Sequence, residues 1–209
     1  MKTLLLTREE NKVKNRIELF GLSRSGKSTL LNKLQEKGEK IIAVNPGFTL
    51  KKVYLALRFI IKSPIISFYL FYKLNTNWAK VKMSPYLYMK LFMLRNSYML
   101  AALAKHESLK KQKEKIFVEE CIVQLLLMIF HSKSNKEELK KIIDILPMPG
   151  QILLIESDSK TRYSRIKNTR FPGQQISKKY AEAWMKNSEH NYKVIKKILL
   201  EKYSSTIFK

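Results

Sequence analysis

One run of residues constrains the fold of this chain more than any other feature. Residues 21–28 read Gly-Leu-Ser-Arg-Ser-Gly-Lys-Ser, which fits the pattern G-x-x-x-x-G-K-[ST] in full. The apolar residues 17–20 before it predict a strand, and Leu30, Leu31 and Leu34 after it lie at helical spacing. A strand, a glycine-containing turn and a helix in this order are typical of an α/β protein.

The residue types in this loop suit the binding of phosphate. Gly21 and Gly26 let the backbone turn tightly and approach phosphate without a Cβ clash. Main-chain N–H groups of the loop and of the helix N-terminus would converge on a β-phosphate. Lys27 would reach the β- and γ-phosphates, and Ser28 offers a hydroxyl to Mg²⁺. We therefore predict ATP and Mg²⁺ as cofactors, with these nucleotide ligands in the loop: Gly21, Ser25, Gly26, Lys27, Ser28 and Thr29.

The rest of the chain alternates short apolar runs with longer amphipathic ones. Residues 1–15 are polar and expected to be loosely held, and residues 49–113 predict helices broken near Pro64, 75–77 and Pro85. Strands alternating with helices predict a three-layer α/β/α fold with a parallel sheet of about five strands and a helical acceptor and lid region. Further strands are expected at residues 40–44, 116–118, 152–155 and 205–208, and further helices at 121–130, 136–146, 159–168 and 176–203.

We expect one domain, in which a core of about residues 16–50 and 114–209 carries a helical insertion of about 51–113. Within that insertion Arg95 is expected on the surface, with contact to an acceptor phosphate as the alternative. Cys121 has no evident histidine partner and is interpreted as a buried small apolar residue.

Residues 17–31, IELFGLSRSGKSTLL, resemble the phosphate loop of thymidylate kinases and related P-loop nucleotide kinases. The resemblance implies that Arg24 helps to neutralise charge on the transferring phosphoryl group. Ser23 stands where those enzymes carry an aspartate that contacts the acceptor. This departure argues against thymidylate as the acceptor and leaves ATP binding untouched.

A carboxylate follows the predicted strand at residues 116–118. In this fold class, a carboxylate at the tip of a neighbouring strand faces the phosphate loop, where it holds Mg²⁺ through water or accepts the acceptor hydroxyl proton. Glu119 fills this place, similar to the Asp-Arg pair of thymidylate kinases and the Glu-Arg pair of deoxynucleoside kinases, with Glu120 in place of the arginine. Ser28 and Glu119 are thus the predicted metal ligands. The alternative is that both glutamates cap the next helix.

Arginines cluster after the predicted strand at residues 152–155. Arg162 and Arg165 are three residues apart, so they share a helix face. The segment is similar to the lid of nucleotide kinases, which implies that Arg162 binds the nucleotide and that Arg165 and Arg170 stabilise the moving phosphoryl group. Asp158 is expected to cap this helix. A solvated basic helix face is the alternative.

The chain is strongly cationic, with 41 Lys and Arg against 17 Asp and Glu and a formal charge of +24. Such a charge points to anionic partners. The phosphate loop narrows that expectation to ATP and a small acceptor, so no stable nucleic-acid complex is expected. The apolar residues 53–72 contain Arg58, Lys62 and Pro64, and they are interpreted as core or lid helices, with peripheral contact to an anionic membrane as the alternative.

These features predict an ATP-dependent phosphotransferase that moves the γ-phosphoryl group to a nucleotide, nucleoside, sugar or other small hydroxyl compound. The alternative is a P-loop NTP-binding regulatory or assembly protein at a membrane or polyanion surface. The short apolar stretch at residues 1–7 does not suit a secretory signal, and one cysteine suits a reducing cytoplasm. The sequence leaves open whether the protein forms a homodimer. The predicted catalytic residues are Lys27, Arg24, Glu119, Arg165 and Arg170.

Overall fold

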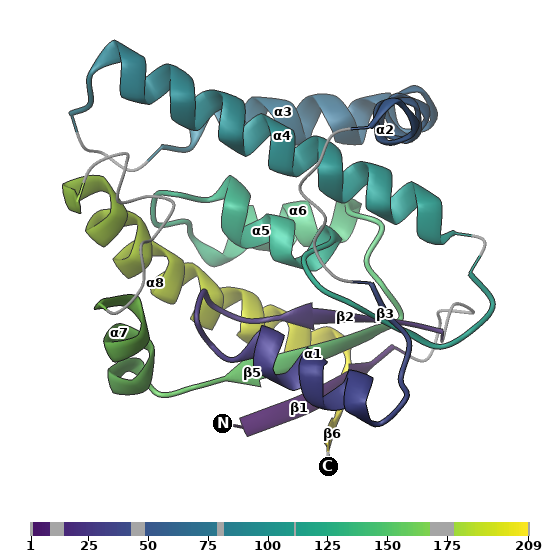
Figure 1. Ribbon diagram of the computed structural model, residues 1–209. Helices are drawn as coiled ribbons and strands as arrows, with labels where there is room; N and C mark the ends of the chain where they lie inside the picture. The colour runs from purple at the N-terminus through teal and green to yellow at the C-terminus, as the bar shows by residue number, and fades with distance from the viewer. Residues whose placement is uncertain are drawn as a thin grey trace.

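The computed structural model of the protein describes residues 2–8, 15–42, 49–78, 82–110, 112–167 and 178–208. The described residues form eight helices and a six-stranded mixed sheet, so the α/β class is confirmed (Figure 1). Most predicted helices and strands are present within a few residues of their expected bounds.

The centre of the sheet is parallel, as the sequence predicted. β2 (Arg16–Phe20) lies between β4 (Ile116–Val118) and β5 (Gln151–Glu156) and runs parallel to both. β3 (Ile41–Ile42) pairs in parallel with the outer side of β4. All residues of β2 and β4 are buried, which explains their continuous apolar runs. The carboxyl ends of β2, β4 and β5 therefore meet at one edge of the sheet.

The other side of the sheet contradicts the prediction of a parallel sheet. β1 (Lys2–Thr7) pairs antiparallel with β5, and β6 (Ser204–Ile207) pairs antiparallel with β1. The sheet order is β3-β4-β2-β5-β1-β6. The expectation that residues 1–15 are loosely held is wrong for residues 2–7, because the partners of β1 lie far along the chain and Leu6 is fully buried between layers.

Helices cover the two faces of the sheet unequally. α1 (Lys27–Glu36) packs on Ile17 and Leu19 of β2, whose side chains point to one face. The opposite face carries Phe20, which packs with α5 (Ile122–Ile129) and α8 (Lys178–Lys202). α6 (Lys136–Ile145) joins this layer through contacts with α8. The apolar residues 152–155 of β5 alternate between these two clusters, because successive strand residues point to opposite faces.

A further layer lies beyond α5, at the top of Figure 1. It contains α2 (Leu50–Lys62), α3 (Pro64–Thr76) and α4 (Pro85–Leu109), with breaks where the sequence placed them. Pro64 and Pro85 occupy the first turns of α3 and α4, where a missing N–H costs nothing. We call α2–α4 the outer helical layer. Of the described helices, none alone is long and apolar enough to cross a bilayer; α2 and α3 together pass by length and composition, but they bend by 110°.

A buried polar cluster connects the outer helical layer to the sheet. Arg16 of β2 donates from Nη1 to Nδ1 of His106 on α4 at 3.1 Å and pairs with Glu18 at 3.2 Å. Glu18 accepts the N–H of Val123, at the start of α5, at 2.9 Å. Burial lowers the pKa of His106 to about 3, with the charge of Arg16 acting in the same direction. The imidazole is therefore neutral, as an acceptor from a guanidinium must be.

Candidate nucleotide site

The predicted phosphate loop connects β2 to α1 at the carboxyl edge of the sheet. A Cβ on Gly21 would lie 2.7 Å from the main-chain oxygen of Ile155 and 2.7 Å from Oγ of Ser25, so only glycine fits there. Gly26 has φ of 100° and Arg24 has φ of 63°, which turn the chain sharply before the helix. The glycine spacing of the motif thus corresponds to one close approach and one left-handed turn.

Lys27 lies across the loop that precedes it. Its Nζ donates to the main-chain oxygens of Gly21 at 2.8 Å and Leu22 at 3.0 Å. Burial lowers its pKa, and the carboxylates of Glu120 and Glu119 act in the opposite direction. Both hydrogen-bond acceptors are neutral carbonyls, so they do not cancel the ammonium charge. A cation held in this way at a helix N-terminus is suited to anion binding.

The structure brings together the two predicted metal ligands. Ser28, on the first turn of α1, donates from Oγ to Oε1 of Glu119 at 3.0 Å. Glu119 directly follows β4, which neighbours β2 in the sheet. Both groups offer oxygen atoms, and the hydrogen bond is exposed. This donor set fits Mg²⁺, which prefers oxygen and retains several water ligands.

Two further charged residues, which the sequence prediction did not select, lie at this site. Glu120 has φ of 48°, and burial raises the pKa of its carboxyl group. Lys105 of α4 donates from Nζ to the main-chain oxygen of Glu119 at 2.7 Å, and burial lowers its pKa. Adjacency to Glu119 was a signal for Glu120. Nothing in the sequence signalled Lys105, because a separate helix brings it to the site.

The predicted lid helix, α7 (Ser159–Lys167), places two of its arginines on the loop. Arg162 is buried; it donates from Nε to the main-chain oxygen of Ser23 at 3.4 Å and pairs with Glu189 of α8 at 2.8 Å. Arg165 donates from Nη1 to the main-chain oxygen of Arg24 at 3.2 Å. A small pocket opens beside the loop between β5, α7 and α8, and Arg162 lines it. The interpretation of α7 as an entirely solvated basic face is wrong for Arg162.

Other predicted residues are placed as follows. Asp158 caps α7 by accepting the N–H of Thr161 at 2.8 Å, as expected. Arg24 and Thr29 have exposed side chains on the loop and on α1. Cys121 is buried near the main-chain oxygen of Ala102, which confirms its interpretation as a small apolar residue. Arg170 lies outside the described residues.

The expectation that Arg95 lies on the surface is wrong. Its guanidinium is 1% exposed and donates to the main-chain oxygens of Asn77 at 3.1 Å and Ile129 at 2.7 Å. It also lies over the Trp78 ring, 4.4 Å from the centroid. Burial lowers its pKa to about 10. These acceptors terminate two other elements, so no local pattern around Arg95 could reveal them.

No protein-family model matches this chain, and a search of curated proteins finds no match. Its function is therefore inferred from the geometry of its own residues.

Proposed function

We propose that this protein is a P-loop phosphotransferase that moves the γ-phosphoryl group of ATP to a small acceptor. The observation that carries the proposal is the 3.0 Å hydrogen bond between Ser28 and Glu119, two residues that the helical insertion separates by 91 positions in the sequence. It lies beside the buried ammonium of Lys27 at the end of the phosphate loop. A full motif, an oxygen donor pair and a buried cation at one sheet edge fit Mg²⁺-nucleotide chemistry.

Different groups at the site would bind the phosphates and the metal ion of Mg²⁺-ATP. Main-chain N–H groups of the loop and of α1 would hold the β-phosphate, and Lys27 would exchange its carbonyl partners for phosphate oxygens. Ser28 and Glu119 would hold Mg²⁺, which would supply positive charge to offset that of the phosphates. Glu119 alternatively accepts the proton of the acceptor hydroxyl.

Arginines would stabilise the charge that develops during transfer. Arg165 already contacts the main chain of Arg24, so a small rotation of its side chain would bring its guanidinium toward a nucleotide on the loop. Arg162 is buried and paired with Glu189, which suits a positioning contact with the nucleotide. We assign Arg24, Arg165 and Arg170 to charge stabilisation, as the resemblance to nucleotide kinases implies.

The acceptor is proposed only as a class. Ser23 and Glu120 replace the aspartate and arginine of thymidylate kinases, so the acceptor differs from thymidylate. Nucleotides, nucleosides, sugars and other small hydroxyl compounds remain candidates. Consumption of ATP and the lone buried thiol of Cys121 both suit a cytoplasmic protein.

An acceptor screen that follows ADP release tests the proposal. One class of acceptor is expected to raise ADP release well above the rate without acceptor, whereas a regulatory NTP-binding protein would show only the basal rate.

Lys27→Ala should lower the acceptor-dependent rate of ADP release by about 10³-fold, because the charge of the phosphates loses its main cation. Lys33→Ala, an exposed position on the same helix, is the matched control. Turnover by Lys27→Ala at the rate of the unchanged chain would contradict the proposal.

A further inference from the structure

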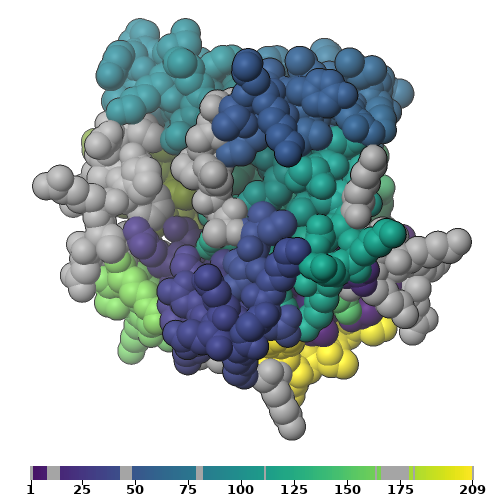
Figure 2. All heavy atoms as spheres, turned by 45° about the vertical axis from the view of Figure 1, so that its right-hand side comes forward, coloured from purple at the N-terminus to yellow at the C-terminus, as the bar shows by residue number. Residues whose placement is uncertain are grey.

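The outer helical layer exposes large apolar side chains to an unusual extent. Ile65 is 83% exposed and Phe68 is 73% exposed, whereas few such residues occur on the other described elements. We call the set Leu50, Leu57, Ile61, Ile65, Phe68 and Met93 the apolar face. The outer helical layer forms a continuous surface along the top of the molecule (Figure 2). Exposed apolar side chains concentrated on one layer of a protein mark an interaction site more often than singly scattered ones.

The helices of this layer are apolar on two sides. In α2, Ala56 and Phe59 are buried, while Leu57 and Ile61 are exposed. α2 makes its most extensive helix contacts with α4, so the buried side of α2 already has a packing partner. Large apolar side chains exposed on a helix that is already packed on another side indicate a second apolar partner. The exposed side of α2 is therefore not explained by the fold of the described residues.

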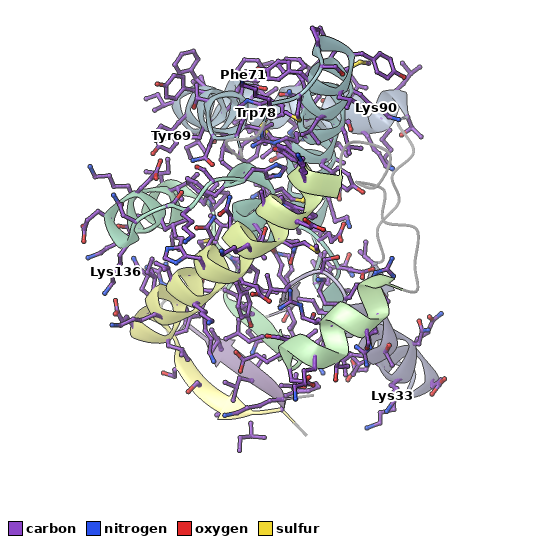
Figure 3. All side chains as sticks on the ribbon, turned by 90° about the vertical axis from the view of Figure 1, so that its left-hand side faces the viewer. Lys33, Tyr69, Phe71, Trp78, Lys90 and Lys136 are labelled. Atoms are coloured by element: carbon purple, nitrogen blue, oxygen red, sulfur yellow. The ribbon has the colours of Figure 1, made fainter. Side chains whose placement is uncertain are left out.

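Charge separates this layer from the rest of the protein. No Asp or Glu occurs anywhere between Glu39 and Glu107, although the same stretch contains many lysines. Lys51 of α2, Lys82 before α4 and Lys90 of α4 are exposed. Figure 3 shows Tyr69, Phe71 and Lys90 on the side of the molecule opposite Lys33 of α1. The outer helical layer thus combines exposed apolar side chains with many cations, and its one acid, Glu107, is buried.

We propose that the apolar face docks on the surface of an anionic lipid bilayer. Apolar side chains of interfacial helices insert to the boundary of the acyl chains, while lysines with long aliphatic stems stay at the headgroup phosphates. The exposed Phe68 and Ile65, together with the excess of cations in the outer helical layer, complement such a surface. A second copy of the chain would bring like charges together, which opposes dimerisation through this face.

The contacts of α2 favour docking over insertion across the bilayer. Arg58 pairs with the buried Glu107 of α4 at 3.1 Å, and Phe59 is buried beneath it. Extracting α2 into lipid would break this ion pair and expose Glu107. The 110° bend between α2 and α3 also lets both helices present side chains to one surface. The inference goes beyond the proposed phosphotransferase activity and does not depend on it.

Vesicle sedimentation of the full chain tests the inference. The protein should bind vesicles of phosphatidylcholine mixed with phosphatidylglycerol about tenfold or more tightly than vesicles of phosphatidylcholine alone. I65S/F68S should lose about tenfold in affinity for the mixed vesicles, because apolar burial is removed. K51E/K82E should also lose affinity, because both lysines are exposed and the change replaces attraction to anionic headgroups by repulsion.

Matched controls lie on the far side of the molecule. Ile207 of β6 is 72% exposed, so I207S removes a similar exposed apolar group without affecting the apolar face. K33E reverses an exposed charge on α1. Both controls should bind vesicles as the unchanged chain does, and I65S/F68S should keep its thermal unfolding midpoint because both positions are exposed. Lys27→Ala should also bind normally, which separates this inference from the proposed activity.

Three results would overturn the inference. The first is equal binding to neutral and mixed vesicles. The second is unchanged vesicle binding by I65S/F68S. The third is binding to RNA or polyphosphate that competes with vesicles and survives I65S/F68S, since that would assign the cations to a polyanion instead of a bilayer.

Discussion

The carboxyl edge of the sheet and the outer helical layer use charged and apolar residues in opposite ways. At the sheet edge, Lys27 and Arg162 are buried and each has defined oxygen partners, while the apolar residues nearby are packed in the core. In the outer layer, Phe68 and Ile65 are exposed, and the one acid of α2, α3 and α4, Glu107, is buried. Fixed partners suit recognition of one small ligand, whereas a broad face suits a surface without fixed geometry.

This comparison implies that the two regions can be changed separately. Substitutions at the sheet edge should alter turnover and leave vesicle binding intact, and substitutions in the apolar face should do the reverse. α4 belongs to both regions, because its Lys105 contacts Glu119 and its Met93 lies in the apolar face. The separation should therefore be sharpest for residues outside α4.

After Lys27→Ala, the largest effect on turnover is expected from Glu119→Gln. Loss of the carboxylate charge should lower acceptor-dependent ADP release by about 10²- to 10³-fold, since a preorganised charged group at a phosphoryl-transfer site contributes on this scale. Glu114→Gln is the matched control, because Glu114 precedes the same strand and pairs with Lys40 on the surface. Vesicle binding should be unchanged in both. Equal turnover by the two variants would remove Glu119 from the site.

A smaller effect is expected from pH, through His106, which lies where the two regions join and makes the free energy of unfolding depend on pH. Its pKa is about 3 in the folded protein and about 6.5 in the unfolded chain, so the unfolded chain binds the proton first. The stability that the neutral His106 contributes to the fold is fully present above pH 6.5 and is lost as the pH falls toward 3. Between pH 7 and 4.5 the free energy of unfolding should fall by about 2 kcal/mol from this residue.

Urea unfolding at the two pH values measures this loss. His106→Gln should be less stable at pH 7 but show a weaker pH dependence than the unchanged chain. His190→Gln, an exposed histidine substitution on α8, is the control and should keep the full dependence. A pH dependence in His106→Gln as steep as in the unchanged chain would contradict the neutral state of the buried imidazole.

An effect of similar size is expected from Gly21→Ala, which should lower the free energy of unfolding by about 1–3 kcal/mol. The added Cβ would lie 2.7 Å from the main-chain oxygen of Ile155, so the phosphate loop must shift. Gly38→Ala is a control with open space around it and φ of 80°; it should cost about 1 kcal/mol through backbone strain alone. Isothermal titration with ATP should show weakened binding only for Gly21→Ala. Equal affinity in the two variants would contradict the role of the loop geometry.

The local elements of this fold could be predicted because periodicity and turn residues are local signals. Pro64 and Pro85 set the helix breaks, and the buried run at residues 152–155 predicted β5. β1 could not be predicted in the same way. Its short leucine run gives a weak strand signal, and its antiparallel pairing depends on strands that are more than a hundred residues later.

The candidate site shows the same division. The phosphate loop and the position of Glu119 after a strand are local patterns, and the fold brings Ser28 and Glu119 within hydrogen-bond distance. Their roles stay predictions. Lys105 was not selected and Arg95 was wrongly expected on the surface, because tertiary contacts decide where both lie. Lys105 contacts the residue after β4, and Arg95 is buried against carbonyl groups at the ends of α3 and α5.

The position of β1 has a consequence for the order in which the protein can fold. β1 is synthesised first, yet it pairs with β5 and with β6 at the far end of the chain, and both chain ends lie together at that edge (Figure 1). During synthesis, residues 2–7 must wait without partners while the phosphate loop and its parallel strands assemble. Pairs so distant in sequence form slowly, so the last step of folding should be closure of this edge.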